Sequence, residues 1–219
     1  MNFLSYDSWF GRFLFLVADV VTLHFLWLLC SLPVFTIGAS TTALYYSCMK
    51  RIRTDEGTIS RNFLAAFKQN FRQATLLWLG LLAIGFLLMT DLRIGLAVGG
   101  WLGKFMLISC SVFLIPYFLI CIYIFPVQAK FENRIRDNLK NAFLMSWQSF
   151  GYSVVLVLIC ATFVLLTFFF QPFMGLLIVC GVGLYGYVTS AVFVQIFRRY
   201  LPEELETDME KNGLSQLQP

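Results

Sequence analysis

Charged residues are scarce in this sequence, and histidine occurs once. Only 13% of the 219 residues are charged, where a soluble domain carries about 25%. No basic run resembles a nucleic-acid-binding patch, which excludes that class of partner. A single histidine cannot supply bases to several nucleophiles, and none of the common metal, phosphate or nucleophile motifs occurs. We therefore expect no enzyme activity, no metal and no cofactor.

The six cysteines give no sign of a redox or metal function. No two are spaced as Cys-x-x-Cys, and all six lie within apolar segments. This pattern favours small, buried packing residues over disulfides or metal ligands.

Apolar residues dominate, at 59% of the chain. Several runs approach the roughly 20 residues that a helix needs to cross about 30 Å of hydrocarbon, and they lack the alternation of barrel strands. We predict an all-α polytopic membrane protein with about six membrane segments. A single transmembrane domain is expected over residues 1–200, followed by an acidic, disordered cytoplasmic tail over 201–219.

The first two segments are predicted to form a helical hairpin over 13–50, broken at Pro33. One continuous helix of this length would extend about 57 Å, nearly twice the hydrocarbon thickness. Proline lacks the backbone donor and ends the first helix. Thr36 or Ser40 can cap the second helix, and the small residues from Gly38 onward offer a packing surface.

The other segments are expected at about 75–89, 104–127, 150–170 and 173–197. Two basic connections, 50–74 and 128–149, each contain a predicted cytoplasmic amphipathic helix that leads into a span. The marker residues of these helices are Asn62, Phe63, Phe67, Phe71, Asn138, Phe143 and Trp147. The two motifs align at the offset that pairs Asn62 with Asn138, and Phe71 then falls on Trp147. A parallel internal duplication and a chance likeness of two interfacial helices both explain the alignment.

The distribution of basic residues predicts the orientation. Nearly all of them fall in the two connections and the tail, while Arg93 and Lys104 lie on the other side. Cytoplasmic loops are enriched in Lys and Arg, so the C-terminus is predicted to be cytoplasmic. Six segments place the N-terminus inside and five place it outside, and the length of the hairpin favours six.

Three polar residues within the spans form a candidate intramembrane polar site: Asp19, His24 and Gln195. A carboxylate in a membrane is costly and needs a partner or a wet cavity. Asp19 could relay protons or bind a ligand, but we favour a structural carboxylate bonded to a neighbouring helix, such as the hydroxyl residues at 40–42. His24 lies about 140° around the helix from Asp19, and we favour a hydrogen-bonded packing role for it.

The segments 26–33, 36–40 and 43–46, with the helix from Phe63 to Phe71, resemble the YesL-like family of bacterial integral membrane proteins. This chain has His24 where the family pattern suggests asparagine. The resemblance implies a multi-pass protein of the bacterial plasma membrane. Relatives are often encoded beside carbohydrate ABC importers, two-component sensors and glycoside-degrading enzymes. The family has no established activity, so no catalytic residues are carried over.

The sequence supports three functional hypotheses. The leading one is an accessory subunit of carbohydrate ABC uptake or sensing, whose partner is an importer or a membrane sensor kinase. The alternative is a small-molecule or ion transporter or channel that uses Asp19, His24 and the broken helix near Pro33. A third is a lipid-binding or membrane-shaping protein that acts through its basic amphipathic helices.

Overall fold

The computed structural model describes residues 9–54, 58–131, 133–169 and 171–201, and their regular structure is entirely helical. The first part contains α1 (Trp9–Cys30), a short 3₁₀ turn η1 (Val34–Thr36), α2 (Ile37–Thr54) and α3 (Ile59–Val98). The second part contains α4 (Gly100–Lys130), α5 (Ile135–Gln148), α6 (Phe150–Phe169) and α7 (Gln171–Arg198).

Five described helices are long and apolar enough to cross a membrane: α1, α3, α4, α6 and α7. Their outer surfaces carry large exposed apolar side chains such as Phe86, Ile108 and Phe169, which suit lipid rather than water. The protein is therefore an all-α polytopic membrane protein, as the sequence predicts.

The sixth expected segment, α2, is a helix of 18 residues that is not among the five apolar spans. It contains several hydroxyl residues and a basic last turn. Most of its residues between Gly38 and Met49 are buried by α1, α3, α4 and α7. The predicted hairpin is present, but protein rather than lipid surrounds its second helix.

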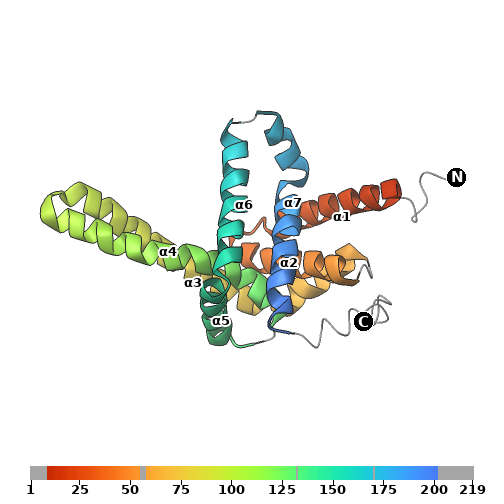
Figure 1. Cartoon of the computed structure of the whole chain (residues 1–219), viewed down its shortest axis with the longest axis horizontal. Coiled ribbons are helices and arrows are strands. Elements are labelled where there is room, and N and C mark those ends of the chain that lie inside the picture. The colour runs from red at the N-terminus through yellow and green to blue at the C-terminus, as the bar shows by residue number, and fades with distance from the viewer. Residues whose placement is uncertain (1–8, 55–57, 132, 170, 202–219) are drawn as a thin grey trace.

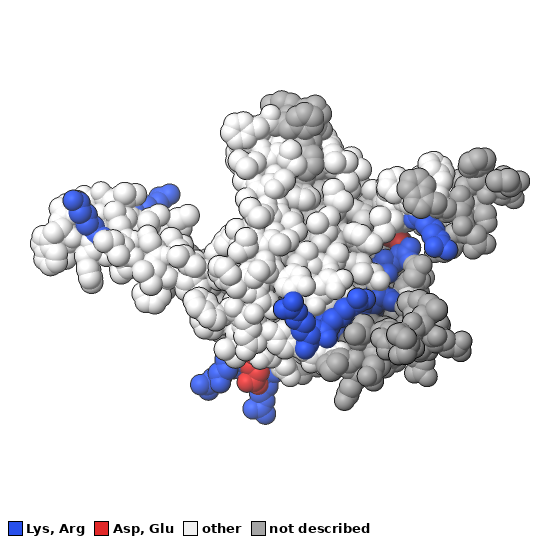
Figure 2. Space-filling model, in the orientation of Figure 1, with Lys and Arg blue, Asp and Glu red and all other residues white. Residues whose placement is uncertain are grey.

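Three arms leave a common centre in different directions (Figure 1). The α3–α4 hairpin extends to one side, α1 to the other, and the α6–α7 hairpin rises between them. Basic side chains gather over the lower part of the molecule and at the end of the α3–α4 arm, whereas the visible face of the α6–α7 arm carries none (Figure 2).

The core lies at the end of the molecule where α2, α4 and α7 finish in basic last turns that contain Arg51, Lys130 and Arg198, and we call this the charged end. One cluster joins α2, α4 and α7 through Tyr45, Tyr123 and Phe193, which are all buried. Their rings make edge-to-face contacts, with Phe193 5.1 Å from Tyr123 and 5.8 Å from Tyr45 between ring centroids. A second cluster around Leu23 and Phe63 joins α1 and the start of α3 to α2. The arms therefore extend from a centre that has its own packed core.

The first amphipathic helix leads into the third span without a break, because α3 runs continuously for 40 residues, about 60 Å. The expected end of this span near residue 89 was wrong, since Asp91 and Arg93 lie inside α3. The turn to α4 comes at Gly99 and Gly100, whose φ values of 62° and 60° are left-handed and suit glycine.

The glycines near this turn also pack. A Cβ on Gly103 would lie 2.6 Å from the carbonyl oxygen of Gly95, so these two residues bring α3 and α4 into close contact. The short turn expected at 171–172 between the last two spans was wrong, since α7 already begins at Gln171. Nearly all of the predicted acidic tail, 202–219, lies outside the described residues.

Candidate functional site

The break at Pro33 is held by hydrogen bonds that cap the preceding helix. The hydroxyl of Thr36 lies 2.6 Å from the carbonyl oxygens of both Cys30 and Pro33. Ser40 donates to the carbonyl of Thr36 at 3.1 Å. The hydroxyls of Thr36 and Ser40 thus donate to carbonyl oxygens and do not accept from the amide groups at the start of α2. The expected cap on α2 was therefore wrong. At the tip, the indole of Trp78 donates to the carbonyl of Val34 at 2.9 Å and ties the turn to α3.

Gly38 sets the distance between α2 and α3. A Cβ at this position would lie 2.5 Å from the carbonyl oxygen of Ala74 and 2.6 Å from Cβ of Trp78. Any side chain here would require the two helices to separate. The close packing of α2 against α3 therefore requires glycine at position 38.

Asp19 forms an ion pair with Arg51, which lies near the end of α2. The two groups are 2.7 Å apart, and the side chains are 27% and 14% exposed, respectively. The hydroxyls at 40–42 bond elsewhere; Thr41, for example, accepts the indole N–H of Trp27 at 3.1 Å. Asp19 therefore has a structural partner, although not the expected one. The pair joins the two antiparallel helices of the hairpin.

His24 bridges two backbone groups of α7. Nε2 lies 3.0 Å from the carbonyl oxygen of Ile178, and the amide of Val182 donates to Nδ1 at 3.2 Å. In a regular helix the amide of Val182 would donate to the carbonyl of Ile178, four residues earlier. The imidazole lies between these two groups and contacts both. A neutral ring protonated on Nε2 satisfies both contacts. Gly183 permits this approach, since a Cβ there would overlap the backbone of Val20.

Asp19, His24 and Gln195 do not form one polar site. Asp19 contacts α2 and His24 contacts α7. Gln195 lies on the exposed surface of α7, further along the helix. Within the described part of the chain, no group of three or more His, Cys, Asp or Glu side chains could hold a metal ion. All six cysteines are free thiols.

A buried amide network joins three helices at the charged end. Gln128 of α4 donates to Asn70 at 3.1 Å and to Gln73 at 2.9 Å, both on α3. Asn138 of α5 donates to Gln128 at 2.7 Å, and both residues are buried. Gln128 is not among the residues predicted from the sequence, although an amide at the end of an apolar helix and beside an amphipathic one was a usable signal.

The marker residues of the two amphipathic helices divide between inner and outer faces. Phe63 and Asn138 are fully buried, whereas Phe71 is 38%, Phe143 43% and Trp147 73% exposed. On α3, Phe67 packs between Phe63 and Phe71 with ring centroids 6.4 and 5.5 Å away. Each helix thus keeps aromatic side chains on its outer surface.

Helix boundaries follow the same offset that aligns the two amphipathic motifs. The end of α2 at Thr54 corresponds to the end of α4 at Lys130, and the start of α3 at Ile59 to the start of α5 at Ile135. We call α2 with α3 the first unit, and α4 with α5 and α6 the second unit. Asn62 accepts from Lys50 at the end of α2 at 3.1 Å, as its counterpart Asn138 bonds to Gln128 at the end of α4. These correspondences support the duplication.

Comparison with known proteins identifies a family over part of the chain. The model of a family described as "Protein of unknown function, DUF624" matches residues 20–92. This range begins directly after Asp19 and includes His24, the break at Pro33 and most of the first unit. No curated protein and no solved structure matches the chain.

Proposed function

We propose that this membrane protein is a non-enzymatic accessory subunit of carbohydrate uptake or sensing in the bacterial plasma membrane. Its partner would be a carbohydrate ABC importer or a membrane sensor kinase. The proposal includes membership of the YesL-like family and a cytoplasmic position for the charged end. The observation that carries it is the exposed aromatic face of α5.

The outer face of α5 suits a protein contact. Its inner face, through Asn138 and Ala142, is fully buried. Trp147 and Phe143 lie on the opposite side, next to the exposed cation Lys140. Trp and Phe are enriched at protein interfaces, and Trp is among the residues that supply most of the binding free energy.

The transporter alternative has less support from the polar residues. The carboxylate of Asp19 is paired with Arg51, and both ring nitrogens of His24 contact α7. A transport site needs polar groups that can exchange protein partners for a substrate. Uptake of radiolabelled monosaccharides and of protons into proteoliposomes tests this alternative. Flux that Asp19→Asn abolishes would favour a transporter over an accessory subunit.

Site-specific crosslinking in native membranes tests the accessory role. A photoreactive amino acid replaces Trp147 in one variant and Trp101 in the other. Trp101 is the matched control, since it is 79% exposed but lies at the distal end of the α3–α4 arm. We expect position 147 alone to crosslink to an importer subunit or a sensor kinase. Identical products at both positions, or none at 147, would contradict the proposal.

A further inference from the structure

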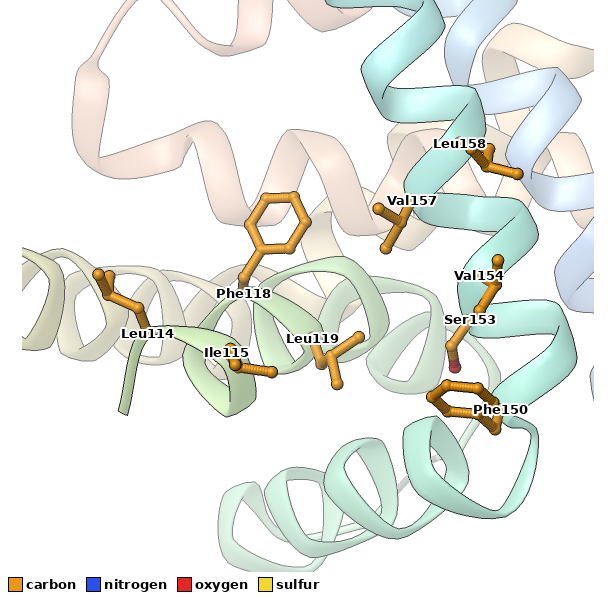
Figure 3. Close-up of a pocket in the computed structure, with 9 residues that line it drawn as sticks. All are labelled: Leu114, Ile115, Phe118, Leu119, Phe150, Ser153, Val154, Val157 and Leu158. Atoms are coloured by element: carbon orange, nitrogen blue, oxygen red, sulfur yellow. The ribbon is translucent and has the colours of Figure 1, made fainter. Parts of the chain in front are cut away.

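An apolar groove opens between α4 and α6. It encloses about 450 Å³ and is lined by Leu114, Ile115 and Phe118 from α4 and by Phe150, Val154 and Val157 from α6, among others (Figure 3). The one polar side chain in its wall is Ser153, whose hydroxyl is occupied by bonds to Tyr123 and the carbonyl of Ser146. A second cavity of about 310 Å³ shares Ile115 and extends the groove along α4 to Leu107.

The corresponding place in the first unit is closed. At the offset that pairs the two units, Leu114 corresponds to Gly38, Phe150 to Ala74 and Val154 to Trp78. Gly38 lies directly against Ala74 and Trp78. Bulky residues in the second unit take the place of Gly38 and Ala74 and line a groove instead of a contact. The groove therefore lies where leucine and phenylalanine replace the small residues of the first unit.

The dimensions of the groove favour a slender occupant. A helix about 10 Å across fills about 420 Å³ per turn, so the main cavity would admit about one turn. The two cavities together follow α4 from Leu107 to Leu119, about 18 Å of helix. Both walls belong to membrane spans, where hydrocarbon chains are the surrounding solvent.

We propose that this groove binds one acyl chain of an anionic phospholipid. Phe150 lines the groove and directly follows the C-terminal end of α5. The first half of α5 and its N-cap expose Arg134, Arg136 and Lys140 against the single described acid Asp137. Lys140 is the nearest of these cations along the helix, about 15 Å from Phe150. Basic residues beside a membrane span attract anionic headgroups. The chain lies in the groove, and the headgroup lies by these cations.

Native mass spectrometry of protein from nanodiscs tests the proposal, with equal amounts of palmitoyl-oleoyl phosphatidylglycerol and phosphatidylcholine. Val154→Trp fills the groove. Val155→Trp is the matched control, because Val155 is 43% exposed on the same helix and does not line the groove. Val157→Phe, a smaller addition, is a second groove variant. Thermal unfolding in detergent checks that each variant is folded.

We expect the wild type and Val155→Trp to retain one phosphatidylglycerol molecule. The folded groove variants should retain at least about tenfold less, since each buried methylene contributes a factor of about four to binding. Equal retention in all variants would overturn the proposal, as would equal retention of the two lipids. A dimer that Val154→Trp dissociates would instead assign the groove to a second copy of the chain.

Discussion

The two units contain equivalent helices at a constant sequence offset, yet one is closed and the other open. In the first, glycine and alanine let α2 lie against α3, and the tip of the hairpin is bonded to Trp78. In the second, leucine and phenylalanine occupy the corresponding positions, and a groove separates α4 from α6. Side-chain size at a few positions thus decides whether a pair of helices forms core or lipid-facing surface.

The units also differ in how the amphipathic helix joins the span. In α3 the two are continuous, whereas α5 and α6 are separated at Ser149, whose φ and ψ are −101° and 43°. The hydroxyl of Ser153 donates to the carbonyl of Ser146 at 2.7 Å and satisfies a group freed by the break. The corresponding positions in α3 are Asn70 and Leu77, and Asn70 bonds to Gln128 instead.

The largest expected effect comes from giving the first unit the residue of the second. Gly38→Leu would force α2 away from Ala74 and Trp78, and we expect a loss of about 3 kcal/mol in the free energy of unfolding. Unfolding in mixed micelles with increasing dodecyl sulfate, followed by tryptophan fluorescence, measures it. Gly80→Leu is the control, because a Cβ at Gly80 meets nothing within 4 Å. Equal losses would show that Gly38 does not set the spacing.

A second comparison uses the two equivalent asparagines. Asn138→Ala removes the donor to Gln128 in a fully buried site, and an unsatisfied buried group costs about 2 kcal/mol. Asn62→Ala should cost about 0.5 kcal/mol, since its partner Lys50 is only partly buried and can bond to water. The same unfolding assay gives both values. A loss for Asn62→Ala as large as for Asn138→Ala would contradict this ranking.

The sequence predicts the helices well and their pairing poorly. Apolar runs locate the spans, and proline together with helix length locates the hairpin at Pro33. The sequence leaves the continuity of α3 undecided, because a change from amphipathic to apolar pattern does not reveal whether the helix is interrupted. Asn70, Gln128 and Asn138 come from three helices, so their network depends on tertiary packing. The partner of Asp19 was misjudged for the same reason.

The smallest expected effect concerns the bond that anchors the hairpin tip in the first unit. Trp78→Phe keeps most of the apolar contact but removes the donor to the carbonyl of Val34, and we expect a loss of about 1 kcal/mol. Amide hydrogen exchange in η1 should become faster, while exchange in α6 stays unchanged because the bond that is removed joins α3 to η1. Trp101→Phe, at the exposed α3–α4 turn, should change neither quantity. Unchanged exchange in η1 for Trp78→Phe would mean that packing around Gly38, and not the indole hydrogen bond, holds the tip.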